Sequence, residues 1–189
     1  MLGELENQLI AFLKASEVGK RLKAVDSLPD TPDKDIVRRW GLEAPAAYAV
    51  ALDGIVTDRG YMVSPFVVVL VARNARGHQA ARQGDGHIIG LYEMVESTIS
   101  LLHEIQGAGR TWFVSGYQFV QDEGLRSSNL HVALVAVQTS APVPPFSTVD
   151  LGEFDHLYAN WSVVPESEQD GKPLAEALIP LTPPSEESS

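Results

Sequence analysis

The chain has 189 residues, of which 44% are hydrophobic, and this is enough for one domain with an apolar core and an appended segment. Its 25 acidic residues against 14 basic ones give a formal net charge of −11, which disfavours a protein whose main work is to grip phosphates. The absence of cysteine excludes disulfides, thiolate metal sites and cysteine nucleophiles.

The sequence also argues against a membrane or export signal. It contains no apolar run of roughly 18 residues, so we expect no membrane span. Its first ten residues, MLGELENQLI, carry acidic side chains where a signal peptide carries basic ones, so we expect no export.

Charge and proline divide the chain in two. Residues 1–146 hold sixteen acidic and thirteen basic residues, whereas residues 147–189 hold nine acidic residues and a single basic one. Eight of the twelve prolines lie between Pro142 and Pro184, and proline lacks the N–H group that helices and sheets need. We therefore predict a folded domain over residues 1–146 and an acidic, proline-rich C-terminal extension over residues 147–189.

The first half of the domain alternates helix and strand signals. Apolar residues at helical spacing predict an amphipathic helix that starts at Leu2 and ends before Gly19. A weak short strand is predicted over 21–27, and a short helix follows with Pro32 at its first position and Trp40 near its end. Two buried strands are predicted over 46–52 and 65–72. The second is β-branched and apolar on both faces, which is typical of the centre of a sheet.

The second half completes an α+β pattern. Residues 73–86 are predicted as a polar, basic loop, and the longest helix of the chain is predicted over 87–105. Two strands, 112–121 and 131–138, close the domain, and residues 122–128 between them are predicted as an exposed hairpin loop. This order predicts an α+β fold, in which two main helices cover one face of a mostly antiparallel sheet and an extended arm follows.

The residue patterns of common catalytic sites are missing. The sequence has no phosphate-binding P-loop and no G-x-S-x-G elbow, and its five histidines lack the spacing of a zinc site. Its carboxylates are scattered, with nothing to pair two of them as acid and base. The amides of Gly84–Gly86 could hold an anion before the predicted long helix, but a flexible loop is the favoured interpretation. We predict no catalytic residues, no metal and no cofactor.

Positive charge is concentrated between the predicted central strand and the long helix. Arg73, Arg76, Arg82 and His87 are the candidate residues of a subunit or tail-tube interface, with His78 close by in sequence. Contact with nucleic acid and a simple solvated loop are the alternatives. Pairing with acids of a neighbouring subunit is the favoured functional interpretation, because this cationic segment stands out in an acidic protein.

The C-terminal extension contains an aromatic-rich patch whose members are Phe154, Leu157, Tyr158 and Trp161. A purely disordered acidic tail would lack them. Burying each large apolar side chain is worth roughly 1.5–3 kcal/mol, so we expect residues 150–165 to be ordered in an assembled particle. These four residues are therefore the candidate contacts of an arm that packs on a neighbouring subunit or on the next protein.

Over residues 1–146 the chain resembles the Mu-like prophage tail terminator family. The matching parts are the opening helix, the strand that runs into residues 72–77 (ARNARG), the Gly-Leu-Tyr stretch at 90–92, and the two closing strands in their order. The resemblance implies a small α/β domain without catalytic residues. It further implies a hexameric ring that caps the tail tube, stops its polymerisation and offers a surface to the neck proteins.

The resemblance also implies partners and a location. The ring would contact the tail tube protein and a neck connector protein, and DNA would pass through its lumen without sequence-specific binding, which a net negative ring would not hinder. The protein would belong to the virion tail or neck, and to the host cytoplasm during assembly. A neck or head–tail joining protein is the main alternative. A small hydrolase and a nucleic-acid-binding module are more distant ones.

Overall fold

The computed structural model describes residues 2–28, 34–107, 109–144, 156–161 and 175–180. The chain divides into two compact units, Met1–Val143 and Pro144–Ser189, and each is described by itself.

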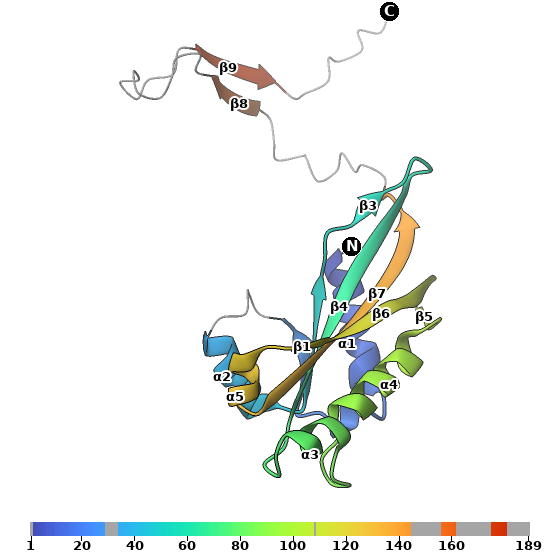
Figure 1. Cartoon of the computed structure of the whole chain (residues 1–189). Coiled ribbons are helices and arrows are strands. Elements are labelled where there is room, and N and C mark those ends of the chain that lie inside the picture. Colours follow the sequence, from blue (N-terminus) through green and yellow to red (C-terminus); the bar gives the residue numbers. More distant parts are fainter. Residues whose placement is uncertain (1, 29–33, 108, 145–155, 162–174, 181–189) are drawn as a thin grey trace, which may run out of the picture. The chain divides into compact units, whose positions relative to one another are not determined.

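The first unit is built on a seven-stranded sheet (Figure 1). The strand order is β1-β2-β4-β7-β6-β5, and β3 pairs with β4 beside this path. All pairs are antiparallel except β1 with β2, which is parallel. The strands are β1 (Ala24–Ser27), β2 (Ala46–Ala51), β3 (Ile55–Val56), β4 (Tyr61–Arg73), β5 (Gln106–Gly107), β6 (Arg110–Val120) and β7 (Leu130–Pro142).

Strand β4 lies in the middle of the sheet, as its β-branched sequence predicts. It pairs with β2 on one side and with β7 on the other, from Tyr61 opposite Pro142 to Arg73 opposite Leu130. Both strands are longer than the predicted ranges, 65–72 for β4 and 131–138 for β7. Their hydrogen-bonded pairing continues past the apolar residues on which the predictions were based. This long pair forms the extended end of the unit in Figure 1, next to β3.

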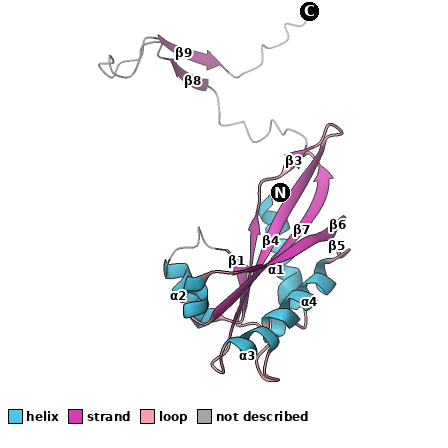
Figure 2. Ribbon diagram, in the orientation of Figure 1, coloured by secondary structure: helices cyan, strands magenta, loops and turns pink. Residues whose placement is uncertain are grey.

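Two helices, α1 (Leu2–Ala15) and α4 (Leu91–Leu102), cover one face of the sheet. The apolar stripe of α1 places Leu5, Leu9 and Leu13 in one buried cluster with alternate residues of β4 such as Phe66 and Val68. Figure 2 shows these helices beside the long strands. The predicted α+β fold, with two main helices on one face of a mostly antiparallel sheet, is confirmed.

The opposite face has a smaller cluster of its own. Helix α2 (Lys34–Glu43) places Trp40 against Tyr48 of β2, with ring centroids 6.2 Å apart. Val69 and Val71 of β4 belong to the same cluster. Because successive residues of a strand point to opposite faces, β4 supplies apolar side chains to both clusters. Residues 29–33, which include the predicted helix start at Pro32, lie outside the described residues.

The prediction of a plain loop over 73–86 is wrong. A short helix, α3 (His78–Gln83), forms within it after Gly77, and Ala81 is buried. Residues 122–128 are mostly exposed, as predicted, but the prediction of a plain loop there is wrong. Helix α5 (Glu123–Ser127) begins there, because the Asp122 carboxylate accepts the Leu125 amide at 2.8 Å and the Leu125 side chain is buried. One buried side chain anchors each of these short helices, Ala81 in α3 and Leu125 in α5, and α5 also has the Asp122 cap.

The predicted long helix over 87–105 is shorter than expected. Helix α4 starts only at Leu91 and ends at Leu102, so the fourteen-residue α1, rather than the twelve-residue α4, is the longest described helix. Residues 87 and 88 are held in a turn by a side chain, and the extended backbone of His103 (φ −73°, ψ 119°) ends the helical path before the positive φ of 62° at Glu104. A 3-10 turn, η1 (Gly19–Arg21), separates α1 from β1 and shortens the predicted strand over 21–27.

In the second unit, β8 (His156–Trp161) and β9 (Ala175–Pro180) pair as an antiparallel two-stranded sheet. Leu157 is paired with Ile179, and Trp161 with Ala175. Three of the four candidate arm residues, Leu157, Tyr158 and Trp161, thus lie on β8, whereas Phe154 lies outside the described residues.

Candidate functional site

The predicted interface cations do not form one group. The Arg73 guanidinium donates to the Gly41 carbonyl at 2.6 Å, and the Nε of Arg76 lies 3.5 Å from a carboxylate oxygen of Asp85. Both groups therefore have partners within their own chain. His87 is exposed on the turn before α4, and Arg82 points to a different environment, described below.

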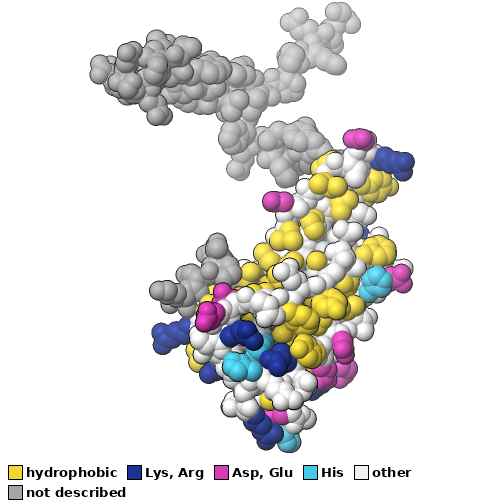
Figure 3. Space-filling model, viewed as in Figure 1, with side chains coloured by type: hydrophobic (Ala, Val, Ile, Leu, Met, Phe, Trp, Pro, Cys, Tyr) yellow, Lys and Arg dark blue, Asp and Glu magenta, His cyan; other side chains and the backbone are white. Residues whose placement is uncertain are grey.

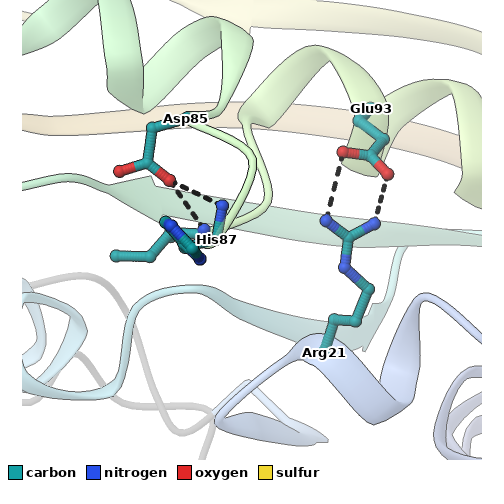
Figure 4. A network of polar contacts seen from close by, with 5 residues as sticks. Arg21, Asp85, His87 and Glu93 are labelled. Carbon is teal, nitrogen blue, oxygen red and sulfur yellow. Dashed lines mark hydrogen bonds and ion pairs between the residues drawn. The ribbon is translucent and has the colours of Figure 1, made fainter.

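The turn around Asp85 is structured by its own carboxylate. One oxygen of Asp85 accepts the amides of His87, at 3.0 Å, and Ile88, at 2.8 Å (Figure 4). The amide of Ile88, the side chain of Asn74 and the amide of His87 lower the pKa of Asp85 to about 2. The Gly84 amide donates to the Ala80 carbonyl at 2.8 Å and the Asp85 amide to the Ile88 carbonyl at 3.3 Å, so these two amides are not free to hold an anion before α4.

Figure 4 also shows an ion pair between η1 and the first turn of α4. The Arg21 guanidinium donates to both carboxylate oxygens of Glu93, one contact measuring 3.4 Å. Both side chains are well exposed, so the pair contributes only about 0–1 kcal/mol to stability. Glu93 is the acidic residue of the first turn of α4, and this ion pair gives its carboxylate a partner in η1.

A pocket of about 360 Å³ brings together three basic side chains from separate elements. Arg82 comes from the last turn of α3, Arg126 from the last turn of α5, and His131 from β7. Leu91 and Tyr92 in the first turn of α4 also line it. We call this the cationic pocket. Figure 3 shows Lys or Arg and His side chains gathered low on the face of the first unit that it displays.

The histidine of the cationic pocket is coupled to its neighbours. The Nε2 atom of His131 lies 3.1 Å from Nδ1 of His78, within hydrogen-bond distance. Partial burial lowers the pKa of His131, and the nearby charges of Arg82, His78 and Arg126 lower it further. His131 is therefore mainly neutral at pH 7 and serves as a polar group beside two permanent cations.

Sequence reasoning found Arg82 but missed Arg126 and His131. Arg126 lies in the segment predicted as a plain loop, and His131 starts a predicted strand. No spacing motif links them to Arg82, because the antiparallel pairing of β4 with β7 brings the beginning of β7 beside the segment that follows β4.

Two apolar surfaces lie at different places on the first unit. An apolar groove of about 770 Å³ runs beside α2 and α5 and is lined by Leu28, Val37, Trp40, Val69, Val120, Asp122, Gly124, Leu125, Val132 and Leu134. The second surface, which we call the apolar end, lies at the outer end of β3, β4 and β7. Its exposed members are Leu52, Ile55, Val56, Tyr61 and Val143. Figure 3 shows hydrophobic side chains along this face of the unit.

In the part of the chain that the structure describes, no group of three or more His, Asp or Glu side chains is placed to hold a metal ion. In the same residues, no helix combines the length and the apolar character needed to cross a bilayer.

The comparisons with known proteins assign the family. No curated protein matches the chain. A family model described as bacteriophage Mu, Gp37 matches residues 1–110, the stretch from α1 to the start of β6, and this is more than half of the chain. This match agrees with the resemblance to a Mu-like phage family. The chain therefore belongs to the bacteriophage Mu Gp37 family and is a phage structural protein.

Proposed function

We propose that the protein is a tail terminator, a virion component whose copies form a ring, most simply a hexamer, on the finished tail tube. In this role it stops tube polymerisation and joins the tail to the neck. Membership of a Mu phage family supports the proposal, as does the resemblance over residues 1–146. Its partners are then other copies of itself, the tail tube protein and a neck connector protein.

The observation that carries the proposal is the presence of two separate apolar surfaces on one small unit. A ring of identical subunits needs a head-to-tail contact, in which one surface of each copy meets a different surface of the next. The apolar end and the apolar groove meet this requirement. Ile55 and Val56 are each 66% exposed at the apolar end, and burying side chains of this size is worth roughly 1.5–3 kcal/mol each.

The charge distribution is compatible with a ring around DNA. The full chain carries a net charge of −11, so a ring of such subunits does not retain DNA that passes through its lumen. Binding of DNA bases is not part of this function. The protein acts in the virion tail or neck and is assembled in the host cytoplasm.

The decisive experiment separates a terminator from a neck connector. A phage that carries Ile55→Asp with Val56→Asp is grown, and its tails are measured by electron microscopy. Loss of a terminator lets the tube grow on, so we expect tails of irregular, excessive length. Loss of a connector instead leaves tails of normal length beside unattached heads, and this outcome would transfer the assignment to the alternative, a head–tail joining protein.

The matched control exchanges the same two residues for other apolar ones, Ile55→Val with Val56→Ile. This variant keeps the apolar end, so we expect tails of wild-type length. Both positions are exposed in the free chain, so neither variant should disturb the fold, and circular dichroism checks this. Wild-type tails from the aspartate variant would show that the apolar end has no part in tail completion.

A further inference from the structure

The cationic pocket contains positive charge without an internal counter-ion. Among the described residues, neither Arg82 nor Arg126 forms an ion pair, whereas Arg21, Arg39 and Arg76 all do. Two guanidinium groups that converge on one concave site present a fork of donors suited to carboxylates or phosphates. Arg126 is exposed and Arg82 is half-buried, and both line the pocket, which leaves donors there for a binding partner.

The start of α4 adds to the positive potential of this pocket. Its N-cap residue is Gly90, which has no side chain to cap the first amides of the helix. The first turn of this twelve-residue helix borders the pocket through Leu91 and Tyr92, so the positive end of the helix dipole lies beside the pocket. The carboxylate of the first turn, Glu93, is already paired with Arg21.

Close packing of two backbone segments holds Arg82 at this helix start. A Cβ on Gly90 would lie 2.2 Å from the Gly84 nitrogen and 2.7 Å from the Arg82 carbonyl oxygen, so only glycine permits the contact. The end of α3 and the beginning of α4 are thereby fixed against each other. The pocket is thus preorganised by the backbone, and Gly90 belongs to the Gly-Leu-Tyr stretch noted in the sequence.

We propose that the cationic pocket binds the carboxylates of residues 166–170 from the C-terminal extension of a second copy of the chain. This proposal rests on the proposed function, because it assigns one of the contacts between subunits. Residues 147–189 carry nine acidic residues and one basic residue, and three of these acids, Glu166, Glu168 and Asp170, fall within five positions. Charge complementarity thus matches the most acidic short segment of the protein to the pocket with two unpaired arginines.

A nucleic acid fits the pocket less well. A DNA backbone would approach two arginines on a chain whose net charge is −11, and DNA-binding surfaces normally carry many more cations. A short acidic peptide segment needs only a local contact, because it places its few carboxylates directly at the two arginines of the pocket.

The test uses two full-length variants and their mixture. The pocket variant carries Arg82→Glu with Arg126→Glu, and the segment variant carries Glu166→Lys, Glu168→Lys and Asp170→Lys. Self-association is measured by sedimentation equilibrium at low salt, at concentrations up to about 1 mM. Each variant alone places like charges at the contact, so we expect its dissociation constant to rise at least about tenfold. In the equimolar mixture, the reversed pocket meets the reversed segment, and we expect association to return.

Restoration in the mixture occurs only if the contact joins different copies. A matched control, Arg38→Glu with Arg59→Glu, reverses two exposed arginines elsewhere and should associate like wild type. Unchanged association of both test variants, a mixture no stronger than either variant, or a wild-type chain that stays monomeric would each overturn the proposal. Binding of duplex DNA that the pocket variant loses, with self-association unchanged, would assign the pocket to nucleic acid instead.

Two further measurements keep these outcomes interpretable. Thermal unfolding of each variant confirms that it is folded, and the neutral pair Arg82→Gln with Arg126→Gln replaces the pocket variant if the reversal unfolds the chain. Tail length in the phage tests the terminator role, whereas sedimentation of the purified chain tests this contact, so the failure of one is distinguishable from the failure of the other.

Discussion

The indole N–H of Trp112 donates to the side-chain oxygen of Gln8 at 3.0 Å, and this bond ties β6 to α1. Trp112 is fully buried, and its ring packs edge-on against Phe66 of the central strand, with centroids 5.5 Å apart. The bond therefore holds α1 against β6. It also gives a partner to the indole N–H of Trp112, which is buried away from water.

Gln8→Leu should destabilise the protein by about 1–3 kcal/mol, because it leaves the buried indole N–H without a partner. Urea unfolding followed by circular dichroism measures this change. The control is Gln79→Leu, which removes an exposed bond to Gln83 and should change stability by less than about 0.5 kcal/mol. Equal effects of the two substitutions would contradict the structural role of the Gln8–Trp112 bond.

Stability should fall in acid partly through Glu43. Burial raises the pKa of Glu43, but hydrogen bonds from Tyr48 and Arg39 outweigh it, and the net pKa lies below the ordinary value of 4.5. A carboxyl group with a lowered folded-state pKa stabilises the fold above its unfolded pKa, and this contribution is lost as the pH falls through the folded pKa.

Tyr48→Phe removes one of the bonds that lower the pKa of Glu43, so the stability of this variant should fall less steeply between pH 5 and pH 3 than that of wild type. At pH 7 the loss of the bond should cost about 0.5–1.5 kcal/mol. Urea unfolding across this pH series provides the measurement, with Tyr61→Phe at an exposed position as the control. Parallel pH profiles for wild type and Tyr48→Phe would reject the coupling.

Gly90→Ala should destabilise the unit by about 1–3 kcal/mol, since its Cβ would overlap the backbone at Gly84 and force α3 away from α4. Gly3→Ala in α1 is the matched control, because nothing lies within 4 Å of the added Cβ and alanine favours the helix by roughly 0.5–1 kcal/mol. Thermal unfolding of the two variants should shift in opposite directions.

Substitutions that remove or reverse the charge of Arg76 test the predicted interface role of the basic segment, residues 73–86. An exposed ion pair is worth only about 0.2–1 kcal/mol, but equivalent contacts repeat around a closed ring. Arg76→Glu should therefore lower the yield of finished virions more than Arg76→Ala does. Thermal unfolding controls for the loss of the Asp85 contact. If both variants gave wild-type yields, Arg76 would have no role in the interface.

Deletion of residues 147–189 should leave a folded body that attaches poorly to tails. Residues Met1–Val143 form a compact unit with hydrophobic clusters of its own, so we expect this unit to fold without the extension. Cooperative thermal unfolding of the truncated protein checks the first half of this prediction, and tail length in a complementation assay checks the second. Full capping by the truncated protein would show that the arm is dispensable.

The sequence by itself determined those features that depend on local patterns. The β-branched run at 65–72 predicted the central strand, because only a strand buried on both faces tolerates such continuous apolarity. The spacing of apolar residues likewise predicted α1 and the core of α4. The ends of α4 could not be read in this way. The Asp85 side chain holds residues 87 and 88 in a turn before the helix, and the extended backbone of His103 ends it, and neither feature alters hydrophobic periodicity.

Only the tertiary structure decided which side chains meet. Arg82, Arg126 and His131 belong to three elements that are separated along the chain, and no motif relates them. They converge because the register of β7 on β4 places the start of β7 beside the end of β4, where α3 and α5 also lie. Long-range strand register depends on the packing of the whole sheet rather than on any local segment. For that reason the sequence indicated positive charge in this region, but the fold selected the three residues that form the cationic pocket.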